Sequence, residues 1–247
     1  MGRDTPARRR ARVHLASLLW TSAGERRVPR DRALRAALQE CEARDAWWVC
    51  EASSAGPVYL LPTVEWIEIL AHTVRSLGAR SVLEVAAGDG LLACALAHAL
   101  PRVRVHACDS GAWAKAAGRM SAADRRRDGT TPFAGIRAGD NVERRSSASA
   151  IAHHRPDLII VSWAPPGLLV ERALRAPAAK LVLELGVDGD VCGNGTRTWR
   201  FHKEFLEGPL EARALCRLDG GAVETPATRA TLYYGRAHPE HGVDDAW

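Results

Sequence analysis

The sequence predicts an α/β fold: a doubly wound, mostly parallel seven-stranded sheet with an antiparallel terminal hairpin, preceded by a helical N-terminal extension. From Ser81 onward, short apolar segments alternate with helical segments, which is typical of a parallel sheet covered on both faces. The last two strand candidates are joined only by a turn-rich segment around Asp219-Gly220-Gly221, so we expect them to pair antiparallel. A chain of 247 residues has room for one such domain and a small extension.

Three regions are expected along the chain. Residues 1–60 form a helical extension, residues 61–236 form the main domain, and residues 237–247 form a C-terminal tail. The extension is rich in Trp and Tyr, including Trp47 and Trp48, and we expect its helical part to act as a lid. A dimer contact or padding behind the sheet are the alternatives.

Helix signals in the first third of the chain are clear. Apolar residues at helical spacing predict a helix over Arg32–Arg44. Thr63 is a candidate N-cap for a second helix that runs to about Ser76. The run Arg8–Arg12 is expected to be a solvated, frayed and dispensable terminus, with a nucleic-acid-binding arm as the alternative.

The hydrophobic period predicts the elements of the main domain. Apolar runs predict strands at Val82–Ala86, Val103–Cys108, Phe133–Arg137, Leu158–Trp163, Lys180–Leu185, Ala212–Leu218 and Thr228–Arg236. Helical spacing predicts helices at Leu91–Leu100, Ala112–Arg126, Leu168–Arg175 and Trp199–Leu206.

The composition excludes several classes of protein. No apolar run approaches the roughly 20 residues needed to cross a bilayer, and the N-terminus makes a poor signal peptide, so we expect a cytoplasmic protein without a membrane partner. The six cysteines form no CxxC pair and no Cys/His cluster with ligand spacing, so we expect free thiols and no metal. The net charge is +5, but only three of the 34 basic residues are lysines, which favours a GC-rich coding sequence over a selected phosphate-binding face.

The segment Ser81–Leu100 combines a strand, a glycine turn and a helix, the usual cradle for a nucleotide-like ligand. Gly88, Gly90 and Ala93 fit the dinucleotide pattern, and Asp109 lies at about the right distance for a ribose hydroxyl. The carboxylate of Asp89 disfavours a pyrophosphate, because like charges repel. S-adenosylmethionine (SAM) has no phosphate and carries a sulfonium and an ammonium, so it tolerates acidic residues at the turn. We therefore expect SAM rather than NAD.

The segment VLEVAAGDG resembles the first motif of class I, Rossmann-like SAM-dependent methyltransferases, a strand that ends E/D-x-G-x-G-x-G. Glu84 takes the acidic position, Gly88 and Gly90 keep two glycines, and Ala86 stands where the first glycine is usual. In the alternative interpretation, Glu84 is a strand-end carboxylate bonded to amides and the glycines serve only a tight turn.

Further segments resemble later motifs of the same family, over about residues 60–236. The resemblance implies that Asp109, followed by Ser110, holds the ribose hydroxyls, and that Asp140, followed by Asn141, meets the adenine amino group. Both aspartates have plain N-cap or turn roles as alternatives. RPDLIIVSWAPPG is similar to the fourth motif, whose strand end, near Ser162, faces the methyl group.

The methyl acceptor is expected beside this fourth motif. Ala164 and Gly167 replace the polar and aromatic ends of the D/N-P-P-Y/F/W sequence used for amine recognition, which argues against nucleobase N-methylation. Trp163 is a candidate wall near the methyl, or an ordinary core residue. His202 on a predicted helix is the candidate general base, with a surface histidine as the alternative. His153-His154 is expected at the opposite end of the sheet.

The segment before the first strand often folds over the cofactor in this family, which makes Tyr59 and Thr63 candidate cofactor contacts. The expected activity is methyl transfer to an O or N nucleophile of a small molecule or peptide, in specialised metabolism such as natural product biosynthesis. RNA methylation, a non-catalytic SAM-fold binding protein and an NAD-dependent enzyme are the alternatives. The protein is expected to be a monomer or homodimer.

Overall fold

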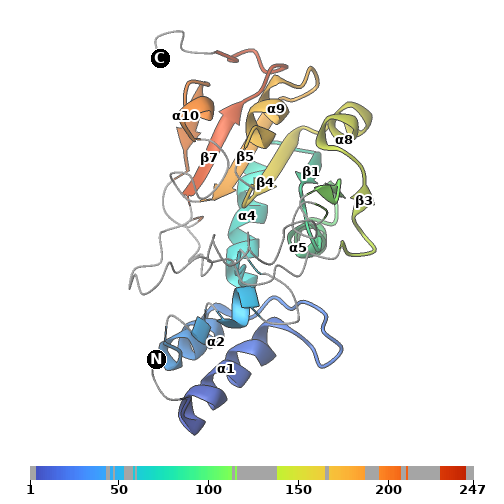
Figure 1. The fold of residues 1–247 in the computed structure, drawn as a ribbon. Helices are drawn as coiled ribbons and strands as arrows, with labels where there is room; N and C mark the ends of the chain where they lie inside the picture. Colours follow the sequence, from blue (N-terminus) through green and yellow to red (C-terminus); the bar gives the residue numbers. More distant parts are fainter. Residues whose placement is uncertain are drawn as a thin grey trace. The chain divides into compact units, whose positions relative to one another are not determined.

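The computed structural model describes residues 4–42, 45–46, 48–52, 58, 60–112, 115, 138–164, 167–186, 195–206, 210 and 229–242 (Figure 1). The chain forms two compact units. The first contains the described residues up to Trp66 together with Lys115, and the second contains the remaining described residues.

The first unit is helical, as expected. Its elements are α1 (Pro6–Leu19), α2 (Asp31–Glu40), the π-helical turn η1 (Trp48–Ala52) and the first residues of α4 (Val64–Ser76). Leu15, Leu19 and Leu34 belong to its buried apolar cluster. The backbone N–H of Trp66 donates to Thr63 Oγ1 over 3.2 Å, which confirms Thr63 as the N-cap of α4.

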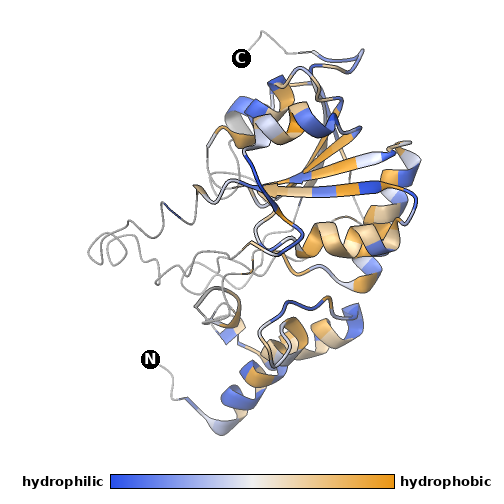
Figure 2. Ribbon diagram, turned by 90° about the vertical axis from the view of Figure 1, so that its right-hand side faces the viewer, coloured by the Kyte–Doolittle hydropathy of each residue, from blue (hydrophilic) through white to orange (hydrophobic). Residues whose placement is uncertain are grey.

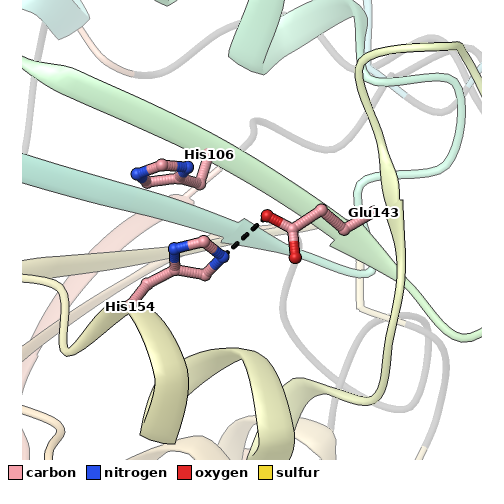
Figure 3. Close-up of side chains that lie close together, drawn as sticks. All are labelled: His106, Glu143 and His154. Carbon is pink, nitrogen blue, oxygen red and sulfur yellow. Dashed lines mark ion pairs between the residues drawn. The ribbon is translucent and has the colours of Figure 1, made fainter.

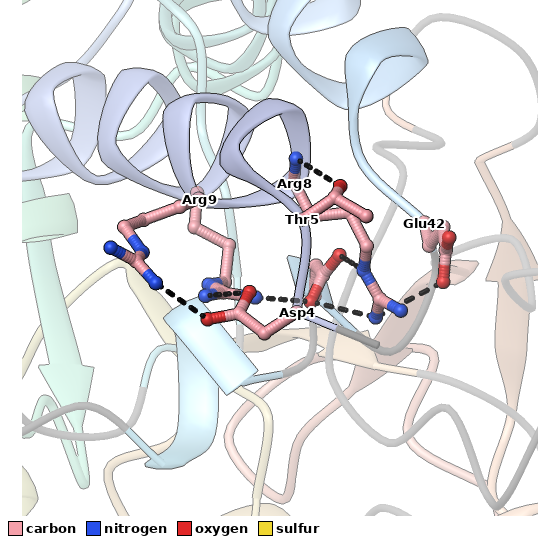
Figure 4. Close-up of polar contacts among 7 residues, drawn as sticks. Asp4, Thr5, Arg8, Arg9 and Glu42 are labelled. Atoms are coloured by element: carbon pink, nitrogen blue, oxygen red, sulfur yellow. Dashed lines mark hydrogen bonds and ion pairs between the residues drawn. The ribbon is translucent and has the colours of Figure 1, made fainter. Parts of the chain in front are cut away.

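The expectation of a frayed arginine-rich terminus is wrong. Thr5 caps α1, and the helix begins at Pro6 (Figure 4). Arg8 Nε lies 2.8 Å from Asp45 Oδ2, and Arg12 Nη1 lies 2.9 Å from Asp45 Oδ1. The Asp45 side chain is only 5% exposed, and the hydrogen bond from Arg8 lowers the pKa of this carboxyl. The start of α1 is therefore tied into the unit by ion pairs that the sequence pattern did not reveal.

The second unit is built around a seven-stranded sheet of order β3-β2-β1-β4-β5-β7-β6. The strands are β1 (Ser81–Val85), β2 (Arg104–Asp109), β3 (Glu143–Arg144), β4 (Leu158–Ser162), β5 (Leu181–Gly186), β6 (Lys203–Phe205) and β7 (Arg229–Tyr234). The first five pair in parallel, and β7 runs antiparallel to both β5 and β6. The predicted doubly wound, mostly parallel sheet with an antiparallel terminal pair is confirmed.

Helices lie on both faces of this sheet. They are α5 (Leu91–Ala99), α8 (Ser147–His154), α9 (Leu169–Arg175) and the short α10 (Gly195–Thr198). The cluster around Leu83, Val85 and Ile151 fills the α8 and α9 face, and a smaller cluster with Ala93 and Ala107 lies under α5. The strands are accordingly largely hydrophobic in Figure 2. Among the described residues, no helix has the length and apolar character that crossing a membrane requires.

One predicted helix is wrong. Residues Trp199–Leu206 do not continue α10; Lys203–Phe205 instead form β6, the edge strand beside β7. Pairing with β7 satisfies backbone groups that a local helix would have satisfied internally, and such tertiary pairing overrides weak helical propensity. The predicted partner strand of the terminal hairpin, Ala212–Leu218, lies outside the described residues.

Other predicted segments also fall outside the described residues. They are the strand Phe133–Arg137 and most of the helix Ala112–Arg126, of which only Ala112 and Lys115 are described. The described strand beside β2 is β3, which follows Asp140 rather than preceding it.

Candidate functional site

The carboxyl ends of the parallel strands bring the predicted cofactor residues to one edge of the sheet. β1 ends at Val85, β2 at Asp109 and β4 at Ser162. The sheet order runs outward from β1 in both directions, to β2 on one side and β4 on the other. In an open α/β sheet, ligands bind outside the strand ends at such a point, where the order reverses.

The turn after β1 uses left-handed backbone at three positions. Ala86 has φ 55°, Gly88 has φ 57° and Gly90 has φ 74°. A Cβ at Gly90 would lie 2.5 Å from Val142 Cγ2, so only glycine fits there. Asn141 Nδ2 also donates to Gly90 O over 3.1 Å, which holds the segment before β3 against the turn. Ala86, which replaces the first glycine of the motif, adopts the left-handed conformation that glycine would adopt, and its side chain makes this conformation strained.

Glu84 lies on β1 with 4% of its surface exposed. Its Oε2 accepts a hydrogen bond from the backbone N–H of Ala93 over 2.9 Å. Burial raises the pKa of Glu84 to about 8; the Ala93 N–H opposes this rise, and the charges of Asp89 and Asp109 add to it. Such a carboxylate is stabilised by a cationic ligand, because a positive charge beside it offsets the lost hydration.

The first N–H groups of α5 are already engaged by carboxylates. Leu91 N donates to Asp89 Oδ1 over 3.1 Å, and Ala93 N donates to Glu84. Free N–H groups at a helix N-terminus are what binds a phosphate. Here the side chains of Asp89 and Glu84 take those two donors, so the turn disfavours a pyrophosphate. Sequence reasoning missed this role of Asp89, whose side chain accepts from the backbone N–H two residues on, as Asp side chains commonly do in turns.

Asp109 is held in place from two sides. Its Oδ2 accepts from Gly88 N over 3.0 Å, and its Oδ1 accepts from Gly111 N over 2.7 Å. Each carboxylate oxygen has a further lone pair, so both remain able to accept from a vicinal diol. Ser110 beside it is exposed, and its hydroxyl accepts from Ala112 N over 3.2 Å.

The other predicted cofactor residues have different surroundings. Asp140 is exposed in the turn that precedes β3, and Asn141 beside it contacts the Gly90 turn. The hydroxyl of Thr63 is engaged in capping α4, and Tyr59 lies outside the described residues. Direct cofactor contacts by these residues stay predictions.

A strained residue follows the last residue of β4. Trp163 follows Ser162 with φ 50°, a conformation that is uncommon for any residue other than glycine and an outlier for a bulky one. Its backbone N–H donates to Leu185 O over 2.7 Å, which anchors it to the end of β5. Strained residues of this kind cluster at functional sites because surrounding structure must hold them. A contact of Trp163 with the methyl group or its acceptor stays a prediction.

The expectation that His202 is a general base is wrong. His202 precedes β6, and its carbonyl accepts from Tyr234 N at the end of β7. Tyr234 pairs with Leu181, the first residue of β5, so His202 lies at the amino edge of the parallel strands. Its ring stacks on Tyr234 with centroids 4.5 Å apart, and its Nδ1 lies 2.9 Å from Glu240 O. The misassigned helix had placed this histidine at the wrong end of the sheet.

Comparisons with known proteins give fold-level likenesses. No family model matches the sequence, and no curated protein matches it. Among solved structures, cofactor-bound Rv0187 from MTB is similar at 17% identity and TM-score 0.43, over 95% of this chain and 99% of that one. The 23S rRNA methyltransferase ErmE is similar at 20% identity and TM-score 0.39, over 74% and 71%. The plantazolicin methyltransferase BpumL, solved with a substrate analogue and SAH, is similar at 12% identity and TM-score 0.38, over 70% and 83%.

These likenesses are distant, and the fold of the chain is defined by its own sheet topology. The parallel pairing of β1 to β5 and the antiparallel direction of β7 are those expected from the sequence. The acidic ends of β1 and β2 flank the glycine turn as the resemblance implied. The chain has a doubly wound, Rossmann-like sheet, which is the fold implied by its resemblance to the class I SAM-dependent methyltransferases.

Proposed function

We propose that this chain is a SAM-dependent methyltransferase acting on an O or N nucleophile of a small molecule or peptide. The observation that carries the proposal is the occupied N-terminus of α5, where Glu84 and Asp89 take the donors that a pyrophosphate would need. With Asp109 beside them, the site is acidic and able to accept from a diol, which suits a cationic nucleoside.

In this proposal, the residues at the carboxyl edge of the sheet have separate roles. When bound, SAM supplies an electrophilic methyl group on a sulfonium. Glu84 would pair with the ammonium of the methionine end, and Asp109 would accept hydrogen bonds from the ribose hydroxyls. Trp163 would form an aromatic wall beside the cationic centre, exclude water and align the acceptor for in-line displacement.

A small molecule or peptide is favoured over RNA because part of the candidate RNA-binding arm is engaged elsewhere. Arg8 and Arg12 both pair with Asp45 inside the N-terminal unit, which reduces the charge left for phosphates. An RNA substrate would require affinity that falls steeply with salt concentration. Binding assays with structured RNA at two salt concentrations separate these substrate classes.

Thermal unfolding with added ligands tests the proposal. SAM and S-adenosylhomocysteine should raise the Tm, and NAD should not, because only a ligand that binds the folded state stabilises it. Asp109→Ala should remove most of the rise, whereas Glu68→Ala, which removes an exposed carboxylate on α4, should keep it. Equal stabilisation by NAD would refute the proposal. Tight SAM binding without turnover of any offered acceptor would instead indicate a non-catalytic binding protein.

A further inference from the structure

Three potential metal ligands meet on the face of the sheet that carries α8. His106 lies on β2, Glu143 on β3 and His154 at the end of α8 (Figure 3). One ligand atom from each residue lies within 4.8 Å of the other two. Pairing of β3 with β2 and packing of α8 beside β2 bring the residues together from distant parts of the sequence. Sequence spacing predicted no metal site because it detects only ligands that are close along the chain.

An ion pair and a ring stack hold the three side chains of this cluster together. His154 Nε2 lies 2.7 Å from Glu143 Oε1, and the His106 and His154 rings stack with centroids 4.0 Å apart. Arg145 Nε lies 3.4 Å from the other oxygen, Glu143 Oε2. The His154 side chain is 10% exposed and that of Glu143 is 36% exposed, so the site is partly open to water.

The chemistry of the cluster suits a transition-metal cation. The cluster supplies two imidazole rings and one carboxylate. Neutral imidazole nitrogen and carboxylate oxygen are ligands that Zn²⁺ prefers. Tetrahedral zinc with bonds of about 2.1 Å holds its ligand atoms about 3.4 Å apart, so rotation of the stacked rings would direct the three ligand atoms at one ion.

We propose that His106, Glu143 and His154 bind one divalent transition-metal cation, preferably Zn²⁺, with water completing its coordination. The site is structural. His106 pairs in register with Leu83, the neighbour of Glu84, so it projects from the face opposite to Glu84. The cation fastens the two-residue strand β3 and the end of α8 onto β2.

Such a cation would also restrict the movement of the glycine turn after β1, although it does not contact that turn. The segment before β3 packs tightly on that turn: a Cβ at Gly139 would lie 2.4 Å from Asp89 O. Fixing β3 therefore limits the movement of the residues that hold the turn, without any part in the chemistry.

The test uses the full-length, tag-free chain after removal of metal by a chelator. Binding of Zn²⁺ is measured by calorimetry, binding of Co²⁺ by its visible absorption, and Tm is measured with and without Zn²⁺. The variants are His106→Gln, Glu143→Gln and His154→Gln, with circular dichroism as the check of folding. His153→Gln is the matched control, because its exposed ring contacts His154 but is outside the cluster. Cys94→Ser removes a second, exposed Cys/His pair on α5.

We expect one Zn²⁺ per chain and a rise in Tm of several degrees, because binding to the folded state alone stabilises it. Each cluster variant should weaken Zn²⁺ binding by roughly 100-fold or more, since even loss of an outer-shell partner costs about 10- to 100-fold. The two controls should bind like the parent. Binding that survives in folded cluster variants, or is lost in a control, would overturn the proposal. So would a Tm that Zn²⁺ leaves unchanged. SAM binding plays no part in these readouts, so they stand apart from the proposed activity.

Discussion

Replacing the buried Glu84 by glutamine should change how the stability of this protein depends on pH. The substitution keeps the size of the side chain, and the new amide oxygen can still accept from Ala93 N. It removes a carboxyl group whose pKa burial raises to about 8. The variant therefore isolates the energetic consequence of ionising this group inside the fold.

The sign follows from proton linkage. With its folded pKa raised above the ordinary 4.5, Glu84 holds its proton more tightly when folded than when unfolded. Its stabilising contribution is fully present below pH 4.5 and is lost as the pH rises to about 8. At about 1.4 kcal/mol per pH unit, that interval corresponds to a loss on the order of 5 kcal/mol in the parent.

Urea denaturation followed by circular dichroism measures this effect. The experiment is done without ligand at pH values between roughly 5.5 and 8.5, where the protonation of Glu84 differs between the folded and unfolded states. The free energy of unfolding of Glu84→Gln, relative to the parent, should increase by about 1.4 kcal/mol per pH unit until about pH 8. The unpartnered amide N–H₂ of the new glutamine lowers the variant's stability by about 1–3 kcal/mol, equally at every pH. The test is therefore how the difference in the free energy of unfolding between variant and parent changes with pH. Glu68→Gln, which removes an exposed carboxyl group, should show no such slope.

Parallel curves for the parent and Glu84→Gln would refute this reasoning, because they would mean that Glu84 does not titrate differently in the folded state. SAM should flatten the parent's curve, since its ammonium stabilises the charged carboxylate. Glutamine should also weaken SAM binding while stabilising the fold at high pH. Stability and cofactor affinity are thus expected to move in opposite directions.

The remaining predictions concern backbone strain and a buried ion pair. Ala86→Gly should stabilise the fold by about 0.5–1 kcal/mol in urea denaturation, because relief of left-handed strain exceeds the added chain entropy of glycine; a loss of stability would contradict this. At Trp163, the glycine variant should be more stable than the alanine variant by a similar margin, and the usual order, alanine above glycine, would show that φ 50° is not retained. Asp45→Ala should lower the Tm more than Arg10→Ala on the exposed side of α1, because it removes the partner that Arg8 and Arg12 share, although Glu42 and Asp4 still pair with them. Equal effects in thermal unfolding would show that the ion pairs contribute little.

Much of the arrangement at the carboxyl edge of the sheet could be predicted because its signals are local. Glu84, Gly88, Gly90 and Asp109 stand at the ends of apolar strands, and parallel strands carry their ends to one edge. The strain at Trp163 could not be predicted, because its φ depends on the anchor to Leu185 in a different strand.

The sequence by itself determined the parallel strands β1, β2, β4 and β5, the glycine turn and the N-cap at Thr63, because hydrophobic period and capping act over a few residues. Only the tertiary structure decided that Lys203–Phe205 is an edge strand, which placed His202 at the amino edge. It also decided that Asp45 binds the arginines of α1, and that two histidines and Glu143 share one face. These features depend on backbone pairing and charge contacts between distant segments, and such contacts exist only once the chain has brought those segments together.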